Sequence, residues 1–128
     1  MNTDELDQLP PGTADFVARW CTQTVAEADE QERRLDFDTH DRLIDIYELL
    51  APSQPTDGHK WVRFPIAQLE YHEQAPQHLA WTLQCADENG EWYAYEDFRH
   101  PGTAFTGTLD DALADIEEDR EGKFFGTF

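Results

Sequence analysis

The sequence predicts an α+β fold, in which an antiparallel meander of about five strands is flanked by an N-terminal and a C-terminal helix. Three observations predict it. Apolar residues recur at helical spacing near both ends of the chain, they alternate at the two-residue spacing of strands in between, and an Asn-Gly pair joins the last two of these strands. The order of helix, strands and helix, without internal repeats, is typical of helices packed on one antiparallel sheet.

The 128 residues fit a single domain that is long enough to bury an apolar core. Residues 1–12 are polar and acidic and end in Pro-Pro-Gly, so we expect a flexible lead-in followed by one α+β domain over 13–128. Hydrophobic residues make up 39% of the chain, and this content argues against intrinsic disorder.

The first helix is expected to begin after Thr13, which is a suitable N-cap, and to continue to about Glu30. Its apolar positions recur at helical spacing and include Phe16, Val17, Trp20 and Cys21. Cys21 and Cys85 both fall on apolar faces and show no C-x-x-C spacing, which predicts buried free thiols in a reducing compartment.

Two strands follow this helix. The first begins at Arg34, where Leu35 and Phe37 alternate with acidic residues, and a turn over 39–42 leads to the second strand over 43–50. The second strand is apolar in both phases. This pattern favours a central position in the sheet, or a face covered by a helix or by a second subunit, so a homodimer is one expectation.

A loop over 52–59 leads to a third strand over 61–71, in which Pro65 implies a bulge or an edge position. The fourth and fifth strands, over 79–86 and 92–95, form a hairpin. A polar stretch then precedes the last helix, where Thr108 and Asp111 have the spacing of a capping box and Gly122 is a natural stop.

The hairpin gives the most detailed prediction. A two-residue turn at Asn89-Gly90 pairs Cys85 with Ala94. The core face then carries Leu79, Trp81, Leu83, Cys85, Trp92 and Ala94. The opposite face carries Thr82, Gln84, Ala86, Tyr93 and Tyr95, and it either contacts a partner or lies under a helix. A three-residue turn reverses this assignment, so the prediction depends on the length of the turn.

The formal net charge is −19, from 28 acidic against nine basic residues. So acidic a surface repels phosphate groups, which argues against direct binding of nucleic acid or of anionic membranes. The charge has three explanations: a solvated surface that keeps the protein soluble, adaptation to a salty cytoplasm, or imitation of a nucleic acid toward a basic partner. The first residues contain no apolar signal segment, and we expect a cytoplasmic protein.

Asp36, Asp38 and His40 form the only candidate metal site. On a strand they share one face, with about 7 Å between successive members, and two carboxylates with an imidazole can bind a divalent metal. The wet side of an amphipathic strand is the simpler explanation, because it requires polar residues at these positions anyway. No nucleophile, zinc or phosphate-binding motif is present in the sequence, so no catalytic residue and no cofactor is assigned.

The candidate partner-binding residues lie in two places. Tyr93 and Tyr95 come from the hairpin, and Asp111, Asp115 and Glu118 come from the acidic last helix. Like charges four residues apart on a helix cost a few tenths of a kcal/mol each. A function that uses the acidic face, or a saline environment, explains why that cost is tolerated.

Four features in a fixed order carry a family resemblance: W-T-L, D-x-N-G-x-W, an acidic helix, and D-x-x-G-x-F-[WF]-G, the last at Asp119, Gly122, Phe124, Phe125 and Gly126. Over residues 14–126, and most strongly from Trp81 onward, the chain is similar to a bacterial family, domain of unknown function 3024. It departs from the family in its Gln84-Cys85 pair and in an added F-R-H-P-G-T-A-F loop. The resemblance implies no activity.

We therefore expect a small, acidic, non-enzymatic domain that acts by binding another protein, with basic proteins among the candidates. Two alternatives remain open. One is a small-molecule or metal-dependent enzyme that uses a cup between sheet and helix. The other is a nucleic-acid mimic that binds a basic partner.

Overall fold

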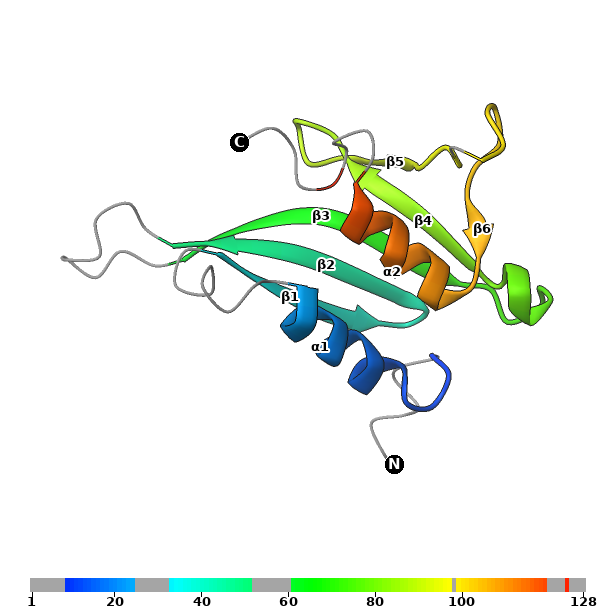
Figure 1. Cartoon of the computed structure of the whole chain (residues 1–128), viewed down its shortest axis with the longest axis horizontal. Coiled ribbons are helices and arrows are strands. Elements are labelled where there is room, and N and C mark those ends of the chain that lie inside the picture. Colours follow the sequence, from blue (N-terminus) through cyan, green and yellow to red (C-terminus); the bar gives the residue numbers. More distant parts are fainter. Residues whose placement is uncertain (1–8, 25–32, 52–60, 98, 120–123, 125–128) are drawn as a thin grey trace.

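The computed structural model describes residues 9–24, 33–51, 61–97, 99–119 and 124. Helices α1 (Thr13–Thr24) and α2 (Leu109–Glu118) lie on one face of a six-stranded antiparallel sheet (Figure 1). The strands are β1 (Arg33–His40), β2 (Leu43–Leu50), β3 (Val62–Tyr71), β4 (Trp81–Ala86), β5 (Trp92–Ala94) and β6 (Thr106–Gly107). This is the α+β fold that the sequence predicts.

The strands follow the order β1-β2-β3-β4-β5, which is the predicted meander. The short β6 is an addition that the sequence does not predict, and it pairs with the first half of β4, while β5 pairs with the second half. Gly107 is required in β6 because a Cβ atom there would lie 2.9 Å from the Cζ atom of the buried Phe105.

The core lies between the sheet and the two helices. It is built from alternate residues of the central strands and one stripe of each helix, and its most buried members include Val17, Ile44, Ile46, Leu69, Leu83, Cys85, Leu113 and Ile116. Both cysteines are free and buried, as predicted, and burial together with the charge of Asp36 raises the pKa of the Cys21 thiol to about 12.

β2 has the predicted bounds and the predicted central position. The residues of its second apolar phase, which include Tyr47, lie on the face of the sheet that α1 and α2 leave uncovered. Long side chains from neighbouring strands cover part of this face instead. The Arg63 guanidinium lies 3.8 Å from the centre of the Tyr47 ring, and its Nη2 donates a 2.7 Å hydrogen bond to Asp38 Oδ2.

Pro65 lies next to a β-bulge, which confirms one of the two predictions made from it. Ile46 pairs with Ala67 and Tyr47 pairs with Pro65, so Ile66 is an extra residue in β3. The bulge allows two consecutive residues, Ile66 and Ala67, to be buried together.

In the β4–β5 hairpin, the predicted core face of β4 is confirmed from Trp81 onward, and the pairing predicted for β5 is wrong by one residue. Cys85 pairs with Tyr93, not with Ala94. Paired residues of antiparallel strands share a face, so Tyr93 lies on the helix side of the sheet, and Trp92 and Ala94 lie on the other side. On β4 the predicted core residues are buried: Trp81, Leu83 and Cys85.

The cause of this shift is a turn of three central residues, 88–90, in place of two. The Asp87 carboxylate accepts hydrogen bonds from the backbone N–H groups of Asn89 and Glu91, at 2.8 and 2.9 Å. The Asp87 N–H donates in turn to the Glu91 carbonyl oxygen. Gly90 has a φ of 79°, the left-handed conformation that ends such a loop.

Several element ends also differ from the prediction. β1 continues to His40, and the turn is reduced to two residues because Asp41 adopts a φ of 53°. Leu79, which was expected to start a strand on the core face, belongs to a 3₁₀ turn (Gln77–Leu79) and is 40% exposed. The predicted helical residues 25–30, the loop over 52–59 and the Gly122 stop lie outside the described residues.

The predicted start of the last helix is confirmed. Thr108 is the N-cap of α2, and its hydroxyl accepts a hydrogen bond from the Asp111 N–H at 3.1 Å. The helix ends at Glu118, after which Asp119 takes a left-handed conformation and its N–H donates to the Asp115 carbonyl. Neither helix in the described part of the chain has the length and apolar character needed to cross a membrane.

Candidate functional site

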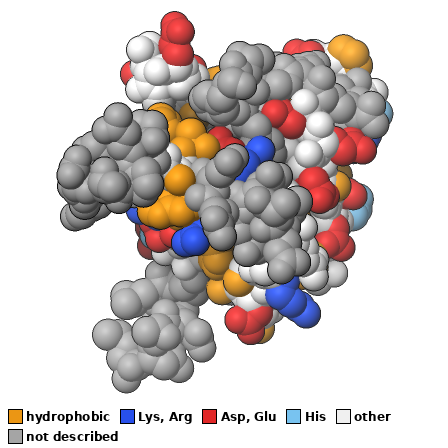
Figure 2. All heavy atoms as spheres, turned by 60° about the vertical axis from the view of Figure 1, so that its left-hand side comes forward, with side chains coloured by type: hydrophobic (Ala, Val, Ile, Leu, Met, Phe, Trp, Pro, Cys, Tyr) orange, Lys and Arg blue, Asp and Glu red, His pale blue; other side chains and the backbone are white. Residues whose placement is uncertain are grey.

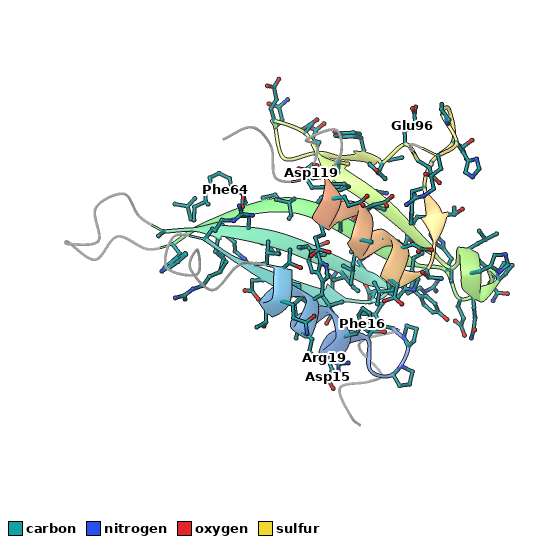
Figure 3. The ribbon with its side chains drawn as sticks, viewed as in Figure 1. Asp15, Phe16, Arg19, Phe64, Glu96 and Asp119 are labelled. Carbon is teal, nitrogen blue, oxygen red and sulfur yellow. The ribbon has the colours of Figure 1, made fainter. Side chains whose placement is uncertain are left out.

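A groove runs between α1 and α2. It consists of two adjoining depressions of about 340 and 320 Å³, and Phe16 and Asp110 line both of them. Figure 3 shows Phe16 on the side of α1 that faces α2. The second depression lies where both helices begin, between residues 10–13 and Thr108–Leu109, so α1 and α2 start at the same end of the groove.

The walls of the groove follow from helical periodicity. The first depression is lined by residues 16, 19, 20 and 23 of α1 and by residues 110, 113, 114 and 117 of α2. Each set has the spacing i, i+3, i+4, i+7, which places its members on one side of a helix. The two stripes are Phe16, Arg19, Trp20 and Gln23 on α1, and Asp110, Leu113, Ala114 and Glu117 on α2.

The interior of the groove is apolar. Phe16 and Trp20 are half-buried and pack against the core, and Leu113 of α2 is almost completely buried. The indole Nε1 of Trp20 is buried without a hydrogen-bond partner among the described residues. An unsatisfied buried donor is unfavourable for the stability of the fold.

The rim of the groove is charged asymmetrically. On α2, Asp110 and Glu117 line it, and the exposed Asp111 and Glu118 lie beside them on the same helix. Arg19 of α1 is the basic residue that lines the first depression. The wall formed by α2 is therefore strongly negative.

Asp115, one of the predicted partner-binding residues, is not part of this acidic surface. Its side chain is fully buried, and both carboxylate oxygens accept hydrogen bonds from Arg99, at 3.0 and 2.7 Å. Arg99 also donates to Asp97 Oδ1 at 3.1 Å. The hydrogen bonds to Asp115 and Asp97 raise the pKa of the Arg99 guanidinium. Asp115 thus ties the loop before β6 to α2, and this contact makes it unavailable to a partner.

The two predicted tyrosines lie on the helix side of the sheet and not on the opposite face, and they differ in burial. Tyr93 is 40% exposed. Tyr95 is buried, with its ring 5.1 Å from the Phe124 ring and 6.2 Å from the Phe105 ring. The one-residue shift in the hairpin explains this placement, since it turns Tyr93 and Tyr95 toward the helix side, where the Tyr95 N–H donates to the Leu83 carbonyl oxygen. Of the five predicted contact residues, the exposed ones are Tyr93, Asp111 and Glu118.

The candidate metal ligands on β1 are engaged with other groups. His40 Nε2 lies 2.9 Å from Asp45 Oδ2, Asp38 is bonded to Arg63, and Asp36 accepts a hydrogen bond from the backbone of the next residue. Within the described residues no three His, Cys, Asp or Glu side chains are close enough together to hold a metal ion. The structure therefore does not bring the three candidates together into a site.

The cup that an enzyme would need between sheet and helix is filled, in the described part of the molecule, by the apolar core. A further depression of about 380 Å³ lies beside the Arg99 loop, where Asp97 and Arg99 are bonded to each other. On the face of the molecule shown in Figure 2, the acidic side chains of the described residues are spread among other residue types.

The family model for the domain of unknown function DUF3024 matches residues 10–126, and the chain belongs to this family. The match confirms the resemblance found in the sequence and extends it to the start of α1. Neither a curated protein nor a solved structure matches the chain.

Proposed function

We propose that this member of the DUF3024 family is a protein-binding module that holds a segment of a partner protein in the groove between α1 and α2. The observation that carries the proposal is a groove with apolar residues left open between two helices, each of which also packs one stripe against the core. The groove is formed by two elements that lie far apart in the sequence, and Phe16 of α1 and Asp110 of α2 line both of its depressions.

The chemistry of the groove favours a protein over a small metabolite. Half-buried aromatic rings such as Phe16 and Trp20 provide large contact areas, and aromatic residues dominate the binding energy of protein interfaces. The acidic wall of α2 adds selectivity for a partner with basic residues, because complementary charges guide association and exclude acidic competitors. The groove lining offers one charged residue on α1, Arg19, and no nucleophile–base pair.

Two matched substitutions test the proposal. Ala114→Arg places a long charged side chain in the groove, whereas Ala18→Arg places the same side chain on an exposed part of α1 outside the groove. Both variants change the net charge equally. We expect the wild-type protein and the Ala18→Arg variant to retain the same partner in co-purifications from the native cells, and Ala114→Arg to lose it.

The two variants must first be compared by thermal unfolding, since the test requires that both fold as the wild type does. The proposal is wrong if folded Ala114→Arg retains every partner of the wild-type protein. It is also wrong if both variants lose the partner equally, because net charge and not the groove would then control binding.

A further inference from the structure

We infer that the segment bound in the groove is a short basic amphipathic α-helix, which packs as a third helix beside α1 and α2. This inference rests on the proposed function and specifies its partner. It follows from three properties of the groove: the main-chain groups available at its walls, the spacing of its lining residues, and the sign of its charge.

The main chain of the walls favours a helix over an extended peptide. An extended segment binds well at a sheet edge, where its backbone groups find partners. Both walls of this groove are helices, whose internal N–H and C=O groups are already bonded within each helix. An extended backbone over Phe16, Trp20 and Leu113 would leave its polar groups unpaired in apolar surroundings, whereas a helix satisfies its own.

The shape of the groove fits the same occupant. The two lining stripes repeat at i, i+3, i+4, i+7, and such rows of side chains are the ridges between which the side chains of another helix fit. α1 has 12 residues and α2 has 10. At about 1.5 Å per residue these walls match a partner helix of about three turns.

The charge of the walls determines the polar side of the occupant. Asp110 and Glu117 line the α2 side of the groove, with Asp111 and Glu118 exposed nearby. Lys or Arg residues that flank the apolar stripe of the bound helix would lie against this wall. The net charge of −19 adds long-range attraction for such a segment.

The test uses the full-length protein and three designed peptides of about 14 residues. The first has Leu at helical spacing with Lys in the other positions. The second contains the same residues in an order without helical periodicity, and the third carries Glu in place of Lys. Binding is measured by fluorescence anisotropy, and helix formation by far-ultraviolet circular dichroism of the mixture minus its components.

We expect the amphipathic Lys peptide to bind at least about tenfold more tightly than the other two, a difference well within the range that a few contacts supply. It should also gain helical signal on binding. Equal affinity for the reordered peptide, or binding without a gain in helicity, would show that the occupant is not an amphipathic helix.

A pair of charge reversals separates the groove from the general acidity of the protein. Glu117→Lys reverses a charge at the groove, and Glu88→Lys makes the same change in the exposed β4–β5 turn. Glu117→Lys should weaken binding of the Lys peptide by about threefold or more. Glu88→Lys should have a far smaller effect on this affinity. Equal effects of the two substitutions contradict the inference.

The failure of this inference is distinguishable from failure of the proposed function. If Ala114→Arg loses the native partner but the Lys peptide binds no better than its controls, the groove binds a protein of another kind and the inferred helix is wrong. If Ala114→Arg retains the native partner, the proposed function is wrong as well.

Discussion

Arg99 and Asp115 form a bidentate ion pair between the loop before β6 and α2. Asp115 is fully buried, whereas the Arg99 side chain is 43% exposed. Removal of Arg99 leaves a buried carboxylate without its partner, so we expect Arg99→Met to lower the free energy of unfolding by about 2 kcal/mol. This loss is smaller than for a fully buried ion pair, because solvent screens the exposed part of the guanidinium. Urea denaturation measures the change.

The control is the double variant Arg99→Met/Asp115→Leu, which replaces the whole pair by apolar side chains. It should be more stable than Arg99→Met alone, because no buried charge is left unpaired. If the double variant is the less stable one, then the pair holds the loop mainly through hydrogen-bond geometry that apolar packing does not replace.

Glu48 gives a second prediction at the residue scale. It is 2% exposed on the core side of β2, with Oε2 3.2 Å from Arg33 Nη2. Burial raises the pKa of this carboxyl above its ordinary value of 4.5, and Arg33 only partly opposes the shift. Between 4.5 and the raised pKa, the folded protein binds more protons than the unfolded chain, so the contribution of Glu48 to stability falls as the pH rises.

Glu48→Gln removes this titration while its carbonyl oxygen can still accept a hydrogen bond from Arg33. The wild-type protein should therefore lose stability relative to the variant as the pH is raised from about 4.5 toward 7. Chemical denaturation of both proteins at a series of pH values measures the difference. A constant difference across that range would contradict the assigned direction of the shift.

At the scale of elements, the β4–β5 turn depends on one carboxylate that bonds two backbone N–H groups. Asp87→Ala removes both hydrogen bonds, and we expect a loss of about 1–2 kcal/mol in unfolding free energy. Asp87→Asn retains an acceptor oxygen in the same place and should lose much less. Similar losses for the two variants would mean that charge, and not the hydrogen bonds, stabilises the turn.

The same turn shows how far the sequence determines these elements. Periodicity predicts β2 with its bounds, Thr108 predicts the cap of α2, and Pro65 predicts a bulge, because each depends on local chemistry. The register of β5 was missed because Trp92 and Tyr93 are both aromatic, so apolar alternation does not decide between two turn lengths. β6 has two residues, which is too short for any periodic signal.

At the scale of the whole molecule, the groove depends on the distance between two helices at opposite ends of the sequence, and no local pattern encodes that distance. The spacing of Phe16 and Trp20 identifies them correctly as apolar helix positions, yet it assigns them to the same stripe as the core residues Val17 and Cys21. The sequence signal for such a groove is an apolar stripe on a helix that is wider than contact with one sheet requires.

Net charge is the remaining whole-molecule property, and it leads to salt effects of opposite sign on folding and on binding. Screening of the repulsion among 28 acidic residues should raise the free energy of unfolding as salt increases. The Debye length falls from about 10 Å at 0.1 M salt to about 3 Å at 1 M. If the charge serves only solubility, the free energy of unfolding should therefore reach a plateau near 1 M salt. Binding of the Lys peptide should weaken over the same range.

Thermal unfolding from 0.05 to 3 M NaCl distinguishes the explanations of the acidity. A rise that continues well beyond 1 M exceeds what screening supplies and supports adaptation to a saline environment. The same titration at a pH nearer the isoelectric value of about 4.2 is the control, since little net repulsion remains there to be screened. A salt dependence at that pH as steep as at pH 7 would mean that net charge is not the cause of the effect.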